Sequence, residues 1–135
     1  MKVYSESIPL QSSKKREGIN FHSRIKAAVE KSGLREGVAI VSSIHSDCAV
    51  VLLQNDPGIL EQLDRTLDRL APPEDLSPDS EEHAPSAHIH GALLGQRVAI
   101  SFSDGRLDLG PREAVFFFEL DGIRPRRVIV KIIGE

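Results

Sequence analysis

The feature that most constrains this chain is a pair of apolar, β-rich runs separated by only three polar residues. Val38–Ile44 and Cys48–Leu53 are almost continuously apolar, and His45-Ser46-Asp47 joins them. Runs of this kind are typical of strands that are covered on both faces. The short polar joint predicts that the two strands form a hairpin. The fold therefore needs an antiparallel sheet with covered faces.

Two amphipathic segments supply helices that can cover such a sheet. Apolar residues recur at helical spacing over residues 21–29 and again over residues 59–70. The first helix is expected to have Asn20 as N-cap and Gly33 as its C′ residue. The expected bounds of the second helix are Asp56-Pro57, a favoured N-cap and first residue, and Pro72-Pro73.

The remaining elements follow the second helix. A short third helix is predicted over Ala87–Leu94, with Ser86 as its cap and Gly95 as its end. The strands predicted after it are Arg97–Phe102, Arg106–Leu109, Glu113–Leu120 and Arg127–Ile133, and residues 2–9 are weakly strand-like. Residues 11–20 are polar and are expected to form a loop. Antiparallel hairpins with segregated helices predict one α+β domain over residues 1–135.

Composition limits the function classes. The chain has 135 residues, a formal net charge of −3 and one cysteine, Cys48. The charge gives no reason to expect nucleic acid as a partner, and no apolar run approaches the roughly 20 residues that cross a bilayer. A single cysteine fits a reducing compartment, and the N-terminus has no apolar signal sequence. We expect a soluble, cytoplasmic protein.

Two further segments bear on exposure and assembly. Residues 72–86 hold four prolines and five acidic residues without Lys or Arg, which predicts an exposed loop, either functional or simply solvated. Phe116, Phe117 and Phe118 must point to both faces of one strand. At least one ring would be exposed in a monomer, so a subunit interface is the simplest cover.

Histidines are the clearest candidates for chemistry. His88 and His90 would share a face on a strand, but on a helix they lie about 200° apart, so we expect one of them to face a site and the other to be exposed. His45 sits where two buried strands end, among Ser42, Ser43, Ser46 and Asp47, and the alternative is a plain polar turn. A neutral imidazole can ligate metals or transfer protons. Cys48 is expected to be a buried structural thiol.

Charged residues near the C-terminus give further candidates. Glu119 ends an apolar strand, where it could act as a base or ligand, or pair with an arginine such as Arg124. Arg124, Arg126 and Arg127 could hold a phosphate or carboxylate through forked hydrogen bonds. Their alternating positions place them on two faces, so we expect ion pairs with residues 72–86 or with a neighbouring chain.

Together these motifs resemble the YjbQ family, also called the secondary thiamine-phosphate synthase family. The matching stretches, in order, are His45-Ser46-Asp47-Cys48 followed by VVLL and Gln54-Asn55, then Asp56-Pro57 through Pro72, Pro85-Ser86, His88-Ile89 and Leu94-Gly95, Asp104-Gly105-Arg106-Leu107, Gly110, Glu119, Arg126-Arg127 and Gly134-Glu135. The resemblance covers nearly the whole chain, and it depends on the order of the motifs more than on any one of them.

The resemblance implies a fold and a site. It implies a two-layer antiparallel β-sandwich with two main helices and a short third helix, assembled as a homotrimer. Some family members join a pyrimidine diphosphate to a thiazole phosphate, which suggests a small phosphorylated metabolite as partner. By position the site residues would be His45, Asn55, His88 and Glu119. His45 and His88 would also be the candidate ligands of a divalent metal.

The sequence departs from the family pattern at positions that bear on activity. Family residues that include two acids and a Trp-Gln pair are replaced by Leu53, Gln54, Gln62, Arg112 and Glu113. Loss of an acid weakens general-base chemistry and cation binding. Two functions therefore stay open. The chain is either a transferase similar to thiamine-phosphate synthase or a non-catalytic trimeric binding protein with a vestigial site.

Overall fold

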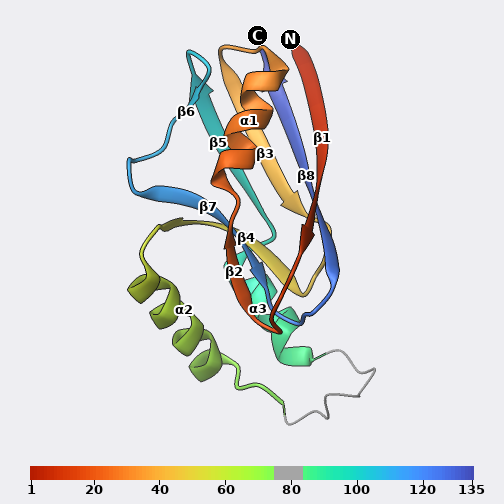
Figure 1. The fold of residues 1–135 in the computed structure, drawn as a ribbon, viewed down its shortest axis with the longest axis vertical. Helices are drawn as coiled ribbons and strands as arrows, with labels where there is room; N and C mark the ends of the chain where they lie inside the picture. The colour runs from red at the N-terminus through yellow and green to blue at the C-terminus, as the bar shows by residue number, and fades with distance from the viewer. Residues whose placement is uncertain (75–83) are drawn as a thin grey trace.

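A computed structural model describes residues 1–74 and 84–135 of the chain. Strands and helices follow one another in a mixed order (Figure 1). The strands are β1 (Lys2–Gln11), β2 (Glu17–Asn20), β3 (Gly37–Ser43), β4 (Cys48–Gln54), β5 (Arg97–Ser103), β6 (Arg106–Leu107), β7 (Glu113–Glu119) and β8 (Pro125–Gly134). The helices are α1 (His22–Ser32), α2 (Pro57–Leu70) and α3 (Pro85–Leu94). The predicted α+β class is confirmed.

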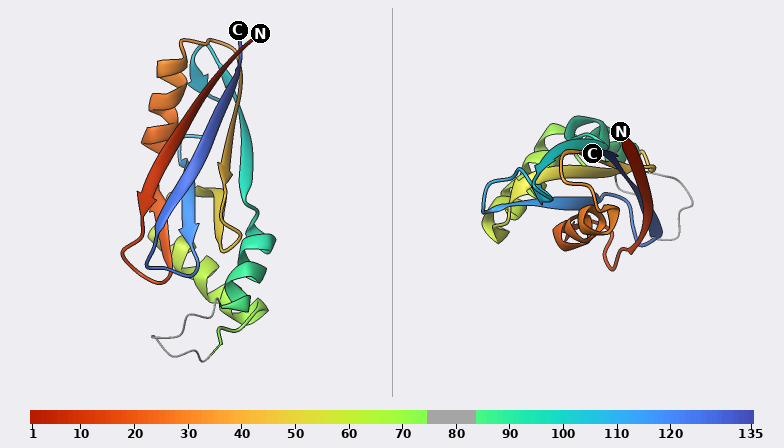
Figure 2. Two further views of the ribbon diagram at one scale, coloured as in Figure 1. Left: turned by 90° about the vertical axis from the view of Figure 1, so that its right-hand side faces the viewer. Right: turned by 90° about the horizontal axis from the view of Figure 1, so that it is seen from above.

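The strands form two antiparallel sheets that face each other across the main core. One sheet has the order β1-β8-β3-β5-β6 and the other has the order β2-β7-β4. Apolar side chains from both sheets and from α1 fill the space between them. A second, smaller cluster lies on the other face of β4 and β7, under α2 and α3. In Figures 1 and 2, α1 lies toward the end that holds both termini, and α2 and α3 lie toward the other end.

The predicted β3–β4 hairpin is wrong. β3 pairs with β5 and β8, whereas β4 pairs with β7 in the other sheet. Residues 44–47 therefore form a corner that carries the chain from one sheet to the other. Both strands are apolar because each contributes to the core between the sheets, and β4 also contributes to the second cluster. The apolar pattern identified the strands but could not identify their partners.

Pairing with distant segments explains two further differences from the predicted elements. β1 runs to Gln11 because it pairs along its whole length with β8, from Lys2 opposite Gly134 to Gln11 opposite Pro125. Residues 17–20, predicted as loop, form β2 because β7 offers them a free edge. Their own composition carries little strand signal.

Two of the predicted helix caps also differ. Phe21, not Asn20, is the N-cap of α1, although the Asn20 side chain accepts a hydrogen bond from the His22 backbone N–H at 3.1 Å. Helix α3 begins at Pro85 with Ala84 as N-cap, so Ser86 lies inside the first turn, where its N–H and hydroxyl both donate to Glu74.

The caps at the other helix ends are as predicted. Gly33 closes α1 in the left-handed region, at a φ of 71°. Asp56 caps α2 by accepting a hydrogen bond from the Gly58 N–H at 2.8 Å, and Pro57 is the first helical residue. Gly95 follows the last residue of α3.

The three phenylalanines are all buried within one chain. Phe117 points into the core between the sheets, where its ring meets that of Phe21 edge to face. Phe116 and Phe118 point to the other face, where the cluster under α2 and α3 covers them. The expectation that one ring needs a subunit interface is therefore wrong, because α2 and α3 supply the cover.

Two sequence expectations concern segments outside this core. Most of the predicted loop over residues 72–86 lies outside the described residues. Within residues 1–74 and 84–135, none of the helices combines the length and apolar character that a membrane crossing requires.

Candidate functional site

The corner between the two sheets carries His45, and α3 packs directly against this corner. The contact depends on Gly91, because a Cβ atom there would lie 2.6 Å from the Ser46 carbonyl oxygen and 3.2 Å from that of Cys48. Only a residue without a side chain lets the helix backbone come this close. Gly91 therefore sets the distance between α3 and the corner.

This close approach brings His88 to the corner. His88 lies about one helical turn before Gly91, and its Nδ1 is 3.0 Å from the Ser46 hydroxyl oxygen. His45 and His88 line the same hollow, which has a volume of about 330 Å³. Its other lining residues are Ile44, Ser46, Asp47, Arg124 and Arg126. The structure thus brings together the two histidines that the family resemblance singles out.

A second hollow adjoins the first on the other side of His45. It has a volume of about 390 Å³. Its lining residues are Pro9, Leu10, Gln11, Ile44, His45, Pro125, Arg126 and Arg127. His45 borders both spaces, so a ligand that contacts this ring can place a polar end beside His88 and an apolar end beside the prolines.

A backbone hydrogen bond fixes the protonation state of His45. The Arg127 N–H donates to His45 Nε2 at 3.1 Å, so Nε2 is an acceptor and the neutral ring carries its proton on Nδ1. Burial and the nearby Arg126 charge lower the pKa of His45 below its ordinary value. His45 is therefore a neutral ring whose remaining polar atom, Nδ1–H, is a hydrogen-bond donor.

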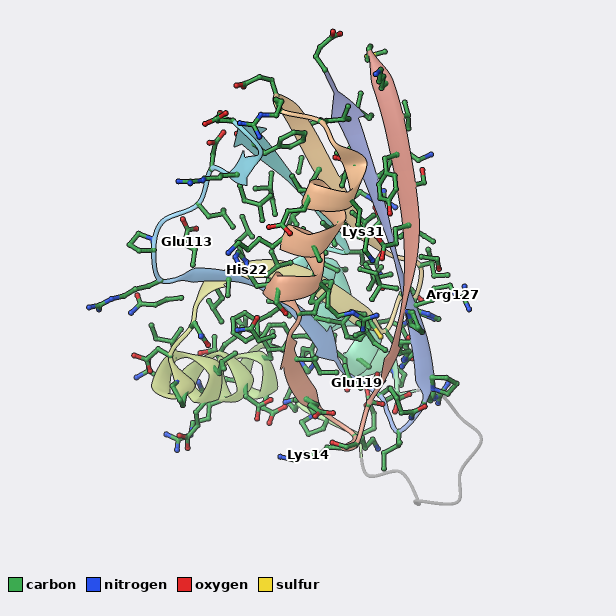
Figure 3. All side chains as sticks on the ribbon, turned by 45° about the horizontal axis from the view of Figure 1, so that its top comes forward. Lys14, His22, Lys31, Glu113, Glu119 and Arg127 are labelled. Atoms are coloured by element: carbon green, nitrogen blue, oxygen red, sulfur yellow. The ribbon has the colours of Figure 1, made fainter. Side chains whose placement is uncertain are left out.

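A buried ion-pair cluster lies behind the corner and holds it in place. The Arg126 guanidinium donates from Nη1 and Nη2 to the two carboxylate oxygens of Asp47, at 2.9 and 3.2 Å. It also donates from Nε and Nη2 to the two oxygens of Glu119, at 2.8 and 2.6 Å. All three side chains are at least nine-tenths buried. Figure 3 shows Glu119 inside the molecule, whereas Arg127 projects outward.

The cluster keeps both carboxylates ionised. Burial alone would raise the pKa of Asp47 and of Glu119, but the hydrogen bonds and charge of Arg126 outweigh it and hold both pKa values below the ordinary range. Burial would likewise lower the pKa of Arg126, and the two carboxylates raise it instead. Glu119 accepts from Arg126 and from the Asp121 N–H and is fully buried, so the structure places it behind the pocket and not at its surface.

The other charged and reactive candidates lie as follows. Arg126 pairs with acids of its own chain, so the expected pairing with residues 72–86 or with a neighbouring chain is wrong for this residue. Arg124 lies 3.5 Å from Asp121 rather than beside Glu119. Cys48 is buried as expected, and burial together with the Glu119 charge raises the pKa of its thiol.

His90 has a structural position rather than the exposed one expected from the helical pattern. Its ring is fully buried, and Nε2 lies 2.7 and 2.8 Å from the carbonyl oxygens of Leu67 and Ala71. Its Nδ1 lies 3.2 Å from Arg16 Nη2. A cation on one side and carbonyls on the other define a neutral ring with the proton on Nε2. His90 therefore ties α3 to the last turn of α2.

Asn55 lies away from the two histidines. It follows the far end of β4, where its N–H donates to the Arg112 carbonyl oxygen at 2.8 Å. Asn55 is seven positions along the strand direction from Cys48, which at about 3.3 Å per residue is about 23 Å. Three of the departures from the family pattern, Leu53, Gln54 and Arg112, lie at this same end. Within one chain they do not surround His45 or His88.

The donor atoms at the His45–His88 pocket do not form a cation site by themselves. Nε2 of His45 accepts from Arg127, and both carboxylates of the corner are saturated by Arg126. Among the described residues, no three His, Cys, Asp or Glu side chains converge on one point. A divalent cation held here would need oxygen atoms from its ligand as well.

The fold and the pocket together define an α+β protein with two antiparallel sheets and a histidine-lined hollow at the corner between them. A sequence model described as UPF0047 protein YjbQ-like matches residues 6–135. The chain therefore belongs to the YjbQ/UPF0047 family, as its motifs predicted. One relative, a UPF0047 protein of Methanothermobacter thermautotrophicus, is 31% identical over 100% of this chain and 95% of its own.

Solved structures show the same fold. A protein of Sulfolobus solfataricus, described as YbjQ-like and of unknown function, superposes with a TM-score of 0.91 at 26% identity over 99% of both chains. A YjbQ/UPF0047 family protein of Clostridium acetobutylicum superposes with a TM-score of 0.87 at 31% identity, over 95% of this chain and 99% of that one. The similarity extends over the whole domain.

Proposed function

We propose that the His45–His88 pocket binds a small phosphorylated metabolite and that the protein transfers a group from a diphosphate, as a thiamine-phosphate synthase does. The observation that carries the proposal is the convergence of His45, His88 and Arg124 on one hollow of about 330 Å³, at a corner that Arg126 holds in place. Neutral imidazole N–H groups and guanidinium groups are the donors that phosphate oxygens accept from.

The two adjoining hollows support a ligand with two unlike ends. The hollow beside His88 offers Arg124 and the Nδ1–H of His45 to an anionic group. The hollow beside Pro9 and Pro125 offers apolar surface to a ring or a chain. Small-molecule sites are commonly built this way, with a few polar groups that orient an otherwise apolar ligand.

The chemistry asked of the site is the departure of diphosphate. When a pyrimidine diphosphate is joined to a thiazole phosphate, the thiazole ring nitrogen forms a bond to the carbon that carries the diphosphate. The carbon–oxygen bond to diphosphate breaks, and its electron pair leaves on oxygen. Positive charge and hydrogen-bond donors at that oxygen lower the barrier. His45 and Arg124 supply such groups, and Arg126 holds the corner that carries His45. A divalent cation used in this step would enter with the diphosphate.

The experiment measures thiamine-phosphate formation from the two phosphorylated precursors, and pyrophosphate binding by calorimetry. His88→Ala and Arg124→Ala are each expected to weaken pyrophosphate binding about tenfold or more, because each removes a charge-assisted or neutral hydrogen bond to phosphate. Arg65→Ala is the matched control, since Arg65 lies on the exposed face of α2 and pairs only with Glu61 among the described residues.

The experiment separates three cases: a transferase, a protein that only binds, and a pocket that does neither. Product formation that His88→Ala and Arg124→Ala reduce, while Arg65→Ala does not, supports the transferase. Pyrophosphate binding at this pocket without any product supports binding alone. Unchanged binding in both pocket variants overturns the proposal.

A second candidate function, a binding protein without catalysis, has a specific observation in its favour. Two of the three candidate general bases are engaged, because Glu119 pairs with Arg126 and Nε2 of His45 accepts from the Arg127 N–H. A pocket that only donates hydrogen bonds can bind an anion without moving a proton. Binding without turnover, in the experiment above, is the result that this function requires.

We also propose that the chain assembles as a homotrimer, as the family resemblance implies. Exposed apolar side chains on α3 support an interface, with Ile89 and Leu93 exposed to 52% and 57%. Next to them an apolar hollow of about 330 Å³ lies between β4, α2 and α3. Light scattering coupled to size exclusion measures the mass directly, and a monomer at micromolar concentration overturns this proposal.

A further inference from the structure

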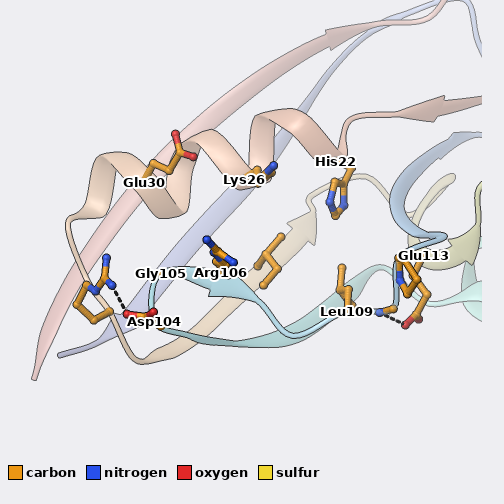
Figure 4. Close-up of a pocket in the computed structure, with 12 residues that line it drawn as sticks. His22, Lys26, Glu30, Asp104, Gly105, Arg106, Leu109 and Glu113 are labelled. Atoms are coloured by element: carbon orange, nitrogen blue, oxygen red, sulfur yellow. Dashed lines mark hydrogen bonds and ion pairs between the residues drawn. The ribbon is translucent and has the colours of Figure 1, made fainter.

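A second cavity lies between α1 and the β5–β6 hairpin, and it shares no lining residue with the His45–His88 pocket. Its volume is about 710 Å³, which is within the range of small-molecule sites. Figure 4 shows it between one flank of α1 and the strands that follow Ser103. Charged side chains dominate its lining, which includes Lys26, Glu30, Arg35, Asp104, Arg106 and Glu113. Nothing in the proposed function uses this space.

One end of this cavity holds an ion pair, and the other holds a carboxylate bound by a backbone N–H. Arg35 forms an ion pair with Asp104 at the hairpin turn. At the other end, Glu113 accepts a hydrogen bond from the Gly110 N–H at 2.8 Å. Asp104 and Glu113 therefore each have a partner within the protein. Other residues line the middle of the cavity.

Two cations in the middle of the cavity are not compensated. Lys26 comes from α1 and Arg106 from β6, and within the described residues neither makes a hydrogen bond or an ion pair. Glu30 is likewise without such a partner, but in Figure 4 its carboxylate points away from Arg106. Like charges that face one hollow repel each other and attract an anion into it.

A histidine at the same wall also lacks a partner. Nδ1 of His22 is buried and makes no hydrogen bond with any described residue. His22 and Lys26 are four residues apart on α1, so their side chains lie on one flank of the helix. A buried ring nitrogen without a partner is costly, and rotation of the His22 ring toward a polar group bound in the cavity would relieve that cost.

We infer that this cavity is a second ligand site, which binds a small organic anion through Lys26 and Arg106. The anionic group, a phosphate or a carboxylate, lies between the two cations beside His22. The body of the ligand rests on Leu107 and Leu109, which are half-buried against the core. This inference is independent of the function proposed for the His45–His88 pocket.

The test is a two-dimensional amide NMR titration of the full chain at low ionic strength, with inorganic phosphate and with malonate in separate series. Saturable shifts are expected at Gly105 and Gly110, and the pKa of His22 should rise because a bound anion stabilises the protonated ring. The better-binding probe identifies phosphate or carboxylate as the preferred group. In the double variant Lys26→Ala, Arg106→Ala, affinity should fall about tenfold or more.

A matched double variant, Arg65→Ala with Lys131→Ala, removes the same charge at exposed positions elsewhere and should bind like the wild-type chain. All the substituted side chains are exposed, so both double variants should unfold at nearly the wild-type temperature. The inference is overturned if neither probe gives saturable shifts around the cavity. It is also overturned if Lys26→Ala, Arg106→Ala binds as tightly as the control.

Discussion

The backbone N–H of Arg127 donates to Nε2 of His45 at 3.1 Å. The relationship follows from the sheet, because β8 extends beyond the end of β3. The last β3–β8 pair is Ser43 with Val128, so Arg127 has no backbone partner on that side. The His45 side chain takes the place of the missing strand residue. His45 therefore borders the pocket and also completes the edge of the sheet.

This hydrogen bond predicts different effects for two substitutions of His45. His45→Ala removes the acceptor, and the free energy of unfolding should fall by about 1 kcal/mol, a small loss because water reaches this edge. His45→Gln can place an amide oxygen near the position of Nε2 and should be closer to wild-type stability. Urea unfolding measures both. Equal losses in the two variants would show that the hydrogen bond does not stabilise the fold.

Elements with strong local signals could be predicted from the sequence. Asp56-Pro57 begins α2 and Gly33 ends α1, because both signals depend on neighbouring backbone groups only. Strand pairing could not be predicted in the same way. β2 forms only because β7 lies beside it, and β3 separates from β4 because two sheets each supply a partner. These are properties of the folded chain rather than of a short segment.

The packing of α3 predicts that Gly91→Ala is destabilising. Helix propensity alone would favour alanine in a helix interior by about 1 kcal/mol. The added Cβ would instead meet the Ser46 carbonyl oxygen at 2.6 Å, which is backbone and cannot rotate away. We expect a net loss of about 1–3 kcal/mol in the free energy of unfolding, typical of overpacking. The matched control is Ala92→Gly, at an exposed position of the same helix, which should lose only the propensity term. A more stable Gly91→Ala variant would mean that α3 does not pack closely on the corner.

Substitution of the two histidines of α3 should change the free energy of unfolding by very different amounts. His90→Phe keeps the ring volume but removes the hydrogen bonds of Nε2 to the Leu67 and Ala71 carbonyl oxygens and the contact of Nδ1 with Arg16, so we expect a loss of about 2–3 kcal/mol in the free energy of unfolding. His88→Phe, at the half-exposed rim, should change stability by less than about 0.5 kcal/mol. Thermal and urea unfolding provide the comparison. The opposite ranking would make His88 the structural residue of the pair.

Only part of the candidate site could be predicted from the sequence. Helical geometry separates His88 from His90, and the family resemblance selects His88 and His45, which the structure brings to one hollow. The sequence could not show that Glu119 belongs to Arg126, because residues 119 and 126 meet only when β7 and β8 face each other across the core. Alternation along β8 was the available signal, since Arg126 shares its face with the buried Val128 and Val130.

The buried cluster of Asp47, Glu119 and Arg126 predicts that the free energy of unfolding falls in acid. It also predicts that the slope of this free energy against pH changes sign when Arg126 is removed. Arg126 holds the pKa values of Asp47 and Glu119 below their ordinary values. The folded chain therefore binds fewer protons than the unfolded chain, and stability present above about pH 5 is lost as pH falls through about 4 and below. The pKa of His45 is also lowered, so this residue contributes a separate loss of stability as the pH falls below about 6.5.

Removal of the cation should reverse the acid slope. Arg126→Leu leaves two ionised carboxylates buried without a partner, and we expect it to cost about 3–5 kcal/mol at neutral pH. The pKa values of Asp47 and Glu119 then rise above their ordinary values, so this variant should gain stability as pH falls from about 7 to 5. Urea unfolding across this range measures the slope, with half-exposed Arg124→Leu as the control that keeps the wild-type sign.

If Arg126→Leu does not fold at neutral pH, the double variant Asp47→Asn, Glu119→Gln tests the same point, because its stability should lose the steep fall below about pH 5. An acid slope like that of the wild-type chain in this double variant would mean that the cluster does not control acid stability.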